Sequence, residues 1–218
     1  MGGRQDLVKD HPRDKVRLNM EVKRRADKIQ DEFLFLGYDI RNVLGTPIDK
    51  CASKSNKVYS IDLTICERTE LLTDFDYDAV GKEKSLHGVA LSYEYALSVY
   101  QRLPQQEKSS FEILGLAIDK DSIKSLGTQE DVCDKGTDIR WNAKENNLDF
   151  FAGFDVATIG YEWISALTNC GLNIEFDLND YYLLSDYKDA LQLKAFAEEQ
   201  IKEHAPFGVW GIWGVKYL

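Results

Sequence analysis

Segments with the apolar spacing of a helix and segments with the apolar spacing of a strand follow one another irregularly along this chain. The order of these segments is the sequence feature that most constrains the fold. Apolar residues three or four positions apart predict helices over residues 13–36, 86–100, 156–170 and 185–204. Alternating or continuous apolar runs predict strands over 57–66, 111–118, 172–178 and 207–217, and a hairpin over 139–152. Because this order is not a regular strand–helix alternation, we expect an α+β fold in which a mixed or mainly antiparallel sheet packs against about four helices.

Residues at the ends of these segments support the boundaries. Asp155 precedes the third predicted helix and Ser185 precedes the fourth, and both residue types accept hydrogen bonds from the unpaired amides at a helix start. The last predicted strand carries glycine at every third position, at Gly208, Gly211 and Gly214. Neither a helix nor a strand requires that spacing, so it indicates a bulge or a close backbone approach.

The chain of 218 residues is long enough to bury a sizeable core. Its prolines are scattered, and it contains no Pro/Gly/Ser-rich linker, no repeat of solenoid period and no low-complexity tract. We therefore expect residues 1–12 to form a flexible basic N-terminal arm and residues 13–218 to form a single α+β domain.

The charge is divided unevenly along the chain. Residues 1–28 hold nine of the 27 Lys and Arg and five of the 37 Asp and Glu, which leaves 18 basic against 32 acidic residues in the rest. Summed charge selects the macromolecules that a surface attracts. The acidic body repels phosphate, so we expect no direct nucleic-acid binding by the body and favour a basic partner protein.

The apolar segments are much shorter than the roughly 20 residues that span a bilayer, and the N-terminus is polar where a signal peptide is apolar. We therefore expect a cytoplasmic protein without membrane contact. The four cysteines, at positions 51, 66, 133 and 170, form no Cys-x-x-Cys pair and have no neighbouring histidine for a zinc site. Reduced thiols and no cofactor are the corresponding expectation.

The most specific chemical motif is a run of alternating carboxylates, Asp74, Asp76 and Asp78, which on an extended segment project to one side and suit a hard divalent cation. An EF-hand loop starting at Asp74 would need glycine and glutamate where the chain has Ala79 and Ser85. Asp76, Asp78 and Val80 fit the Asp-x-Asp-x-Val pattern of haloacid-dehalogenase-like enzymes, but the residues before them make a poor strand. A nucleotidyltransferase would need a Gly-Ser motif just upstream, which is missing. No catalytic residue is assigned.

These observations favour a non-enzymatic acidic interaction protein that binds and inhibits or sequesters a basic or nucleic-acid-binding partner, as immunity proteins and phage inhibitors do. The alternative is a divalent-metal-dependent phosphohydrolase or nucleotidyl-transfer enzyme that uses the three alternating carboxylates. The candidate binding residues combine carboxylates with the two tryptophans of the last predicted strand, because aromatic residues dominate interface energetics: Asp74, Asp76, Asp78, Glu130, Asp131, Asp134, Trp210 and Trp213.

Overall fold

A computed structural model describes residues 32–44, 57–62, 66–69, 71, 85–86, 89–126, 147–159, 163–168 and 175–216. The chain from Phe33 onward forms one compact unit. The predicted boundary between residues 12 and 13 lies outside the described residues.

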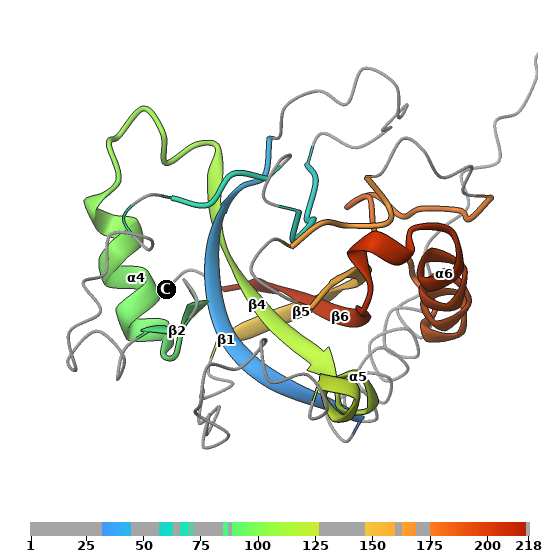
Figure 1. Cartoon of the computed structure of the whole chain (residues 1–218). Coiled ribbons are helices and arrows are strands. Elements are labelled where there is room, and N and C mark those ends of the chain that lie inside the picture. Colours follow the sequence, from blue (N-terminus) through green and yellow to red (C-terminus); the bar gives the residue numbers. More distant parts are fainter. Residues whose placement is uncertain are drawn as a thin grey trace, which may run out of the picture. The chain divides into compact units, whose positions relative to one another are not determined.

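A six-stranded antiparallel sheet organises this unit (Figure 1). Its spatial order is β2-β3-β1-β4-β6-β5, so that the long strands β1, β4, β6 and β5 lie side by side, with β5 at the edge. All the pairings of these strands are antiparallel. The strands are β1 (Phe33–Asn42), β2 (Ser85–Leu86), β3 (Val89–Ala90), β4 (Phe111–Asp119), β5 (Leu148–Thr158) and β6 (Phe207–Val215).

Three α-helices accompany the sheet in the described part of the chain: α4 (Tyr93–Arg102), α5 (Lys120–Leu126) and α6 (Tyr187–Gln200), followed by a 3-10 turn, η1 (Lys202–His204). The Ser92 hydroxyl caps α4 by accepting from the Tyr95 amide at 3.2 Å. The Asp186 carboxylate caps α6 by accepting from the Lys188 amide at 2.7 Å. Both caps satisfy amides that the first turn of a helix leaves without a partner.

Aromatic side chains fill the space between one face of the sheet and the helices. Tyr38 of β1 packs edge-on against Tyr93 of α4, with ring centroids 5.9 Å apart. The ring centroids of Phe154 in β5 and Tyr187 in α6 are 5.6 Å apart. Residues directly opposite one another in a ladder project to the same face, and the registers place Tyr38 and Phe154 on one face. Helices α4 and α6 therefore cover the same face.

The prediction of about four helices is wrong for this fold. The largest error is at residues 156–170, where residues up to Thr158 continue strand β5 and pair with β6, for example Val156 with Val209. Likewise, Phe33 and Leu36, which we assigned to the first helix, belong to β1. Both β1 and β5 are buried on both faces over most of their length. A strand buried on both faces loses its alternation, so its apolar residues fit a helical stripe by chance.

The other predicted elements agree more closely with the structure. Strands are confirmed at 111–118 and at 207–215, and the last helix is confirmed with Asp186 rather than Ser185 as its cap. The second predicted helix begins only at Tyr93, because the short strands β2 and β3 precede it. Residues 57–62 are not a strand of the sheet, although amides such as that of Tyr59, which donates to the Tyr181 carbonyl at 3.0 Å, hold them in place.

Gly153 and Gly214 are two of the positions at which the sheet requires glycine. Gly153 has a φ of 147°, and a Cβ at this position would lie 2.8 Å from the Leu184 carbonyl oxygen. Gly214 packs against the ring of Phe150, and a Cβ there would lie 2.2 Å from a ring carbon. The close approach of Phe150 accounts for one of the three regularly spaced glycines of the last strand.

Among the described residues, no helix combines the length and the hydropathy that crossing a lipid bilayer requires.

Candidate functional site

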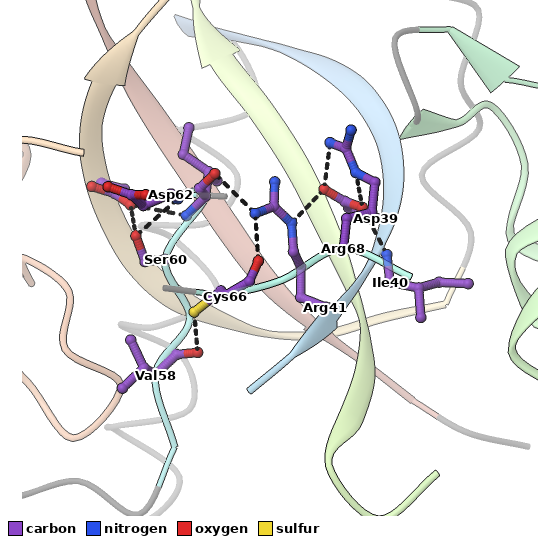
Figure 2. A network of polar contacts seen from close by, with 10 residues as sticks. Asp39, Ile40, Arg41, Val58, Ser60, Asp62, Cys66 and Arg68 are labelled. Carbon is purple, nitrogen blue, oxygen red and sulfur yellow. Dashed lines mark hydrogen bonds and ion pairs between the residues drawn. The ribbon is translucent and has the colours of Figure 1, made fainter. Parts of the chain in front are cut away.

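Two polar residues of β1 project from the sheet face opposite to α4 and α6. Asp39 and Arg41 are two positions apart, so their side chains leave the strand on the same side. Both are buried, with exposed fractions of 0% and 1%. Arg68 joins them because residues 41 and 68 form an isolated antiparallel bridge. We call Asp39, Arg41 and Arg68 the arginine cluster (Figure 2).

The carboxylate of Asp39 binds both arginines. Arg41 Nε donates to Oδ2 at 2.6 Å, while Arg68 donates from Nε to Oδ1 at 2.8 Å and from Nη2 to Oδ2 at 2.9 Å. Burial by itself raises the pKa of Asp39, but the positive charges of Arg41 and Arg68 outweigh burial and lower that pKa below its ordinary value. Asp39 is therefore ionised at neutral pH, where its single negative charge faces two positive ones.

Arg41 also fastens irregular segments to the sheet. Its Nη1 donates to the carbonyl oxygens of Ile61 and Cys66, each at 2.9 Å (Figure 2). The guanidinium carbons of Arg41 and Arg68 lie 5.5 and 4.8 Å from the ring centroid of Trp163. These distances are in the range of cation–π attraction. The arginine cluster thus joins three separate segments, around residues 61, 67 and 163, to strand β1.

A second buried group surrounds Asp155 of β5. Its Oδ2 accepts from the Ser60 hydroxyl at 2.9 Å and from the Ile61 amide at 3.0 Å, and its Oδ1 accepts from the Val156 amide at 2.8 Å and from the Ser165 hydroxyl. Burial raises the pKa of Asp155 more than the hydrogen bonds from Ser165, Ile61 and Ser60 lower it. Asp155 therefore holds its proton to a higher pH than an ordinary aspartate does.

Asp62 completes this group from the segment that carries Ser60. Its Oδ2 accepts from the Ser165 amide at 3.0 Å and from the Thr168 hydroxyl at 2.5 Å. Asp62 and Asp155 thereby tie residues 163–168 to residues 57–62 and to β5. We call Ser60, Asp62, Asp155, Ser165 and Thr168 the serine–aspartate cluster.

Cys66 lies between the two clusters and is fully buried, and its Sγ donates to the Val58 carbonyl oxygen at 3.4 Å. Burial raises the pKa of Cys66 to about 11. The thiol is therefore protonated at neutral pH, and it acts as a small packing group rather than as a nucleophile.

Chemically, the two clusters stabilise the fold from inside. Their carboxylates accept hydrogen bonds from buried donors, so the irregular segments that cover this face of the sheet are held by charge-assisted bonds. In the described ranges, no three side chains of His, Cys, Asp or Glu come together in a way that could hold a metal ion.

The residues predicted to bind a partner fall into two groups. Asp74, Asp76, Asp78, Glu130, Asp131 and Asp134 lie outside the described residues. Trp210 and Trp213 lie in β6 with exposed fractions of 2% and 5%. Trp210 packs on Trp163 with ring centroids 5.0 Å apart, and Trp213 packs edge-on against Phe151 with ring centroids 4.9 Å apart. Both indole rings are thus directed into the protein, one toward each face of the sheet.

Sequence reasoning did not identify either cluster. Asp155 was predicted to cap a helix, and Asp62 lies within the strand predicted over residues 57–66. A usable signal was present in β1, where Asp39 and Arg41 interrupt an otherwise apolar run at strand spacing. Two opposite charges on one side of a buried strand require each other or further partners. Their partners Arg68 and Trp163 are distant in sequence and only the fold brings them together.

The fold and the clusters define a class: an antiparallel α+β protein whose sheet is covered by helices on one face and by irregular, ion-paired segments on the other. Comparisons with models of known protein families, with curated proteins and with solved structures find no match to this chain.

Proposed function

We propose that this protein is a non-enzymatic interaction protein that binds a basic or nucleic-acid-binding partner protein through an acidic surface and inhibits or sequesters it. The observation that carries the proposal is an exposed acidic segment, residues 175–186. It contains four exposed carboxylates and neither lysine nor arginine: Glu175, Asp177, Asp180 and Asp186.

This acidic segment is held at the edge of the sheet. Strand β5 is the last strand in the sheet order, and Phe154 exchanges backbone hydrogen bonds with Leu184 at 2.8 and 2.9 Å. The side chain of Asn179 donates to the Ala152 carbonyl oxygen at 2.8 Å and accepts from the Tyr181 amide at 2.9 Å. Carboxylates on a fixed backbone lose less conformational entropy when a partner binds, and complementary charge accelerates the encounter.

The same segment also presents an aromatic side chain. Tyr181 is partly exposed and stacks on Tyr59 with ring centroids 4.7 Å apart. Tyrosine beside carboxylates suits the guanidinium group of arginine, which both stacks on rings and pairs with carboxylates. A basic partner rich in arginine fits this surface.

The test is a pull-down from the native host with the full chain as bait, in low and in high salt. The partner should be retained at low salt and lost at high salt, because salt screens exposed charges. A triple variant, Glu175→Gln/Asp177→Asn/Asp180→Asn, should fail to retain the partner at either salt concentration. The matched control neutralises three exposed carboxylates elsewhere, Glu107→Gln/Asp149→Asn/Glu199→Gln, and should keep it. The proposal is contradicted if the partner is retained equally at both salt concentrations, or if both triple variants lose the partner equally.

A further inference from the structure

Helix α6 carries apolar side chains on more than one side. Ala190, Leu193 and Ala197 are its buried residues. Leu191 and Phe196 lie outside this buried side, with exposed fractions of 41% and 38%. They are two of the three large apolar side chains that are exposed in the described part of the chain. A helix that packs on a sheet from one side is usually polar on the other, so this exposed pair indicates a second packing surface.

The exposed residues of α6 form one continuous face. Apart from Gln200 at the end of the helix, every exposed residue of α6 is three or four positions from another, as neighbours on one side of a helix are: Lys188, Leu191, Gln192, Ala195, Phe196 and Glu199. We call these residues the outer face of α6. It is roughly 16 Å long, and its apolar residues lie between a basic end and an acidic end.

The two charges of the outer face match each other rather than a neighbour in the fold. In the described part of the chain, neither Lys188 nor Glu199 belongs to an ion pair. Lys188 is three positions before Leu191, and Glu199 is three positions after Phe196. The opposite charges are therefore equally far from the apolar middle. A face of this kind is complementary to itself when it is turned end to end.

We propose that the outer face of α6 binds the outer face of a second copy of this chain, with the two helices antiparallel. In this dimer Lys188 of each copy meets Glu199 of the other, and a two-fold axis makes the two ion pairs equivalent. Leu191 and Phe196 of both copies are covered between these pairs. A parallel arrangement would instead bring each charge beside its like, which is unfavourable.

The size of the outer face indicates a weak dimer. A single helix face of this length buries less than the roughly 1,200 Å² at which stable interfaces begin. The net charge of −10 also makes two copies repel each other. We expect a dissociation constant on the order of 100 µM, so the chain is monomeric in dilute solution and dimeric when concentrated. The outer face includes no residue of the acidic segment 175–186, so this dimer is independent of the proposed partner binding.

The experiment is sedimentation equilibrium of the full chain at concentrations from well below to well above that constant. The average mass should rise from the 24.9 kDa of one chain toward twice that value. The variant Leu191→Gln/Phe196→Gln should keep the monomer mass throughout. The matched control is Leu44→Gln, which changes an exposed leucine outside α6 and should leave the rise unchanged. A monomer mass of the unsubstituted chain at every concentration overturns the proposal, and the outer face then has a different occupant. An unchanged rise in Leu191→Gln/Phe196→Gln overturns it as well, because the copies then meet elsewhere.

A charge exchange tests the antiparallel arrangement. Lys188→Glu and Glu199→Lys should each weaken dimerisation roughly tenfold, because like charges then meet at both ends of the outer face. An equimolar mixture of the two variants should dimerise again, since in the mixed dimer every charge meets its opposite. Each substitution suits the dipole of α6, with the acid near its start and the base near its end, so the helix itself is not weakened. A mixture that associates no better than its two components overturns the proposal.

Discussion

Asp39 and Arg68 form a two-point ion pair across 29 positions of sequence, with Nε bound to Oδ1 at 2.8 Å and Nη2 bound to Oδ2 at 2.9 Å. Asp39 comes from the middle of strand β1, whereas Arg68 comes from an irregular segment that covers the sheet. Arg41 Nε donates to Oδ2 of the same carboxylate at 2.6 Å. One buried aspartate therefore binds both arginines of the cluster.

Removing the charge of Asp39 should destabilise the protein strongly. Asp39→Asn removes the Asp39 charge from buried Arg41 and from Arg68, and breaking a buried pair from one side costs about 3–5 kcal/mol. The free energy of unfolding from urea titration measures the loss. Asp149→Asn, at an exposed residue of the edge strand β5, is the control and should leave the urea midpoint unchanged. A small effect of Asp39→Asn would show that the cluster does not stabilise the fold.

The pKa of Asp155 gives a pH dependence of defined sign. Because burial raises the pKa of Asp155 in the folded protein, the folded state binds this proton more tightly than the unfolded state does. Its contribution to stability is therefore present at low pH and is lost as pH rises from about 4, the pKa of an unfolded aspartate, through the raised pKa. Asp155→Asn removes this titration.

The measurement is the free energy of unfolding of the unsubstituted protein and of Asp155→Asn across that pH range. The unsubstituted protein should lose stability relative to the variant as the pH rises. The changed hydrogen bonds of the variant add a difference in the free energy of unfolding that is the same at every pH and does not affect this trend. Parallel curves would contradict the raised pKa. Asp39 titrates in the opposite sense, because its lowered pKa makes its stabilisation present above about pH 4 and lost as the pH falls through the folded value.

Cys66 should be unreactive in the folded protein. With a pKa of about 11, roughly one thiol in a thousand is ionised at about pH 8, and the thiolate is the reactive form. Alkylation at that pH followed by peptide mass spectrometry should leave Cys66 unmodified in the native protein and modified after denaturation. Fast labelling of Cys66 under native conditions would mean that the segment over it opens readily.

Gly153→Ala should destabilise the sheet by about 2–5 kcal/mol. The φ of 147° is unfavourable for a side chain, and the new Cβ would meet the Leu184 carbonyl oxygen at 2.8 Å. Chemical denaturation gives the size of the effect. The control is Ala195→Gly on the exposed side of α6, an exchange between the same two residue types at an unstrained position. It should cost only about 1 kcal/mol. Comparable losses in both variants would argue against strain at Gly153.

A thermal shift with Mg²⁺ or Mn²⁺ separates the proposed binding function from the metal-dependent alternative. We expect no rise of the unfolding midpoint at millimolar metal. If Asp74, Asp76 and Asp78 bind a divalent ion, the midpoint must rise, and Asp76→Ala must abolish the rise. That result would favour the enzyme alternative and count against the interaction protein.

The sequence predicted the elements whose patterns are local. Strand β4 is a short apolar run between polar segments, and α6 has a capping residue and a clear inward stripe, so both were found. The helix predicted after Asp155 was wrong because β5 is buried on both faces, and burial on both faces hides the alternation that marks a strand. The exposed carboxylates of 175–186 were visible as acidic sequence, but their fixed position on the edge of β5 was not.

The sequence by itself determined the acidic charge of the body, the mixture of helix and strand, and the apolar character of the last strand, because these depend on composition and on neighbours along the chain. Only the tertiary structure decided that Asp39 meets Arg68, that Asp155 lies among serines, and that Trp163 lies beneath two guanidinium groups. Each of these contacts joins residues far apart in sequence. Their energies depend on burial, which exists only once the chain has folded.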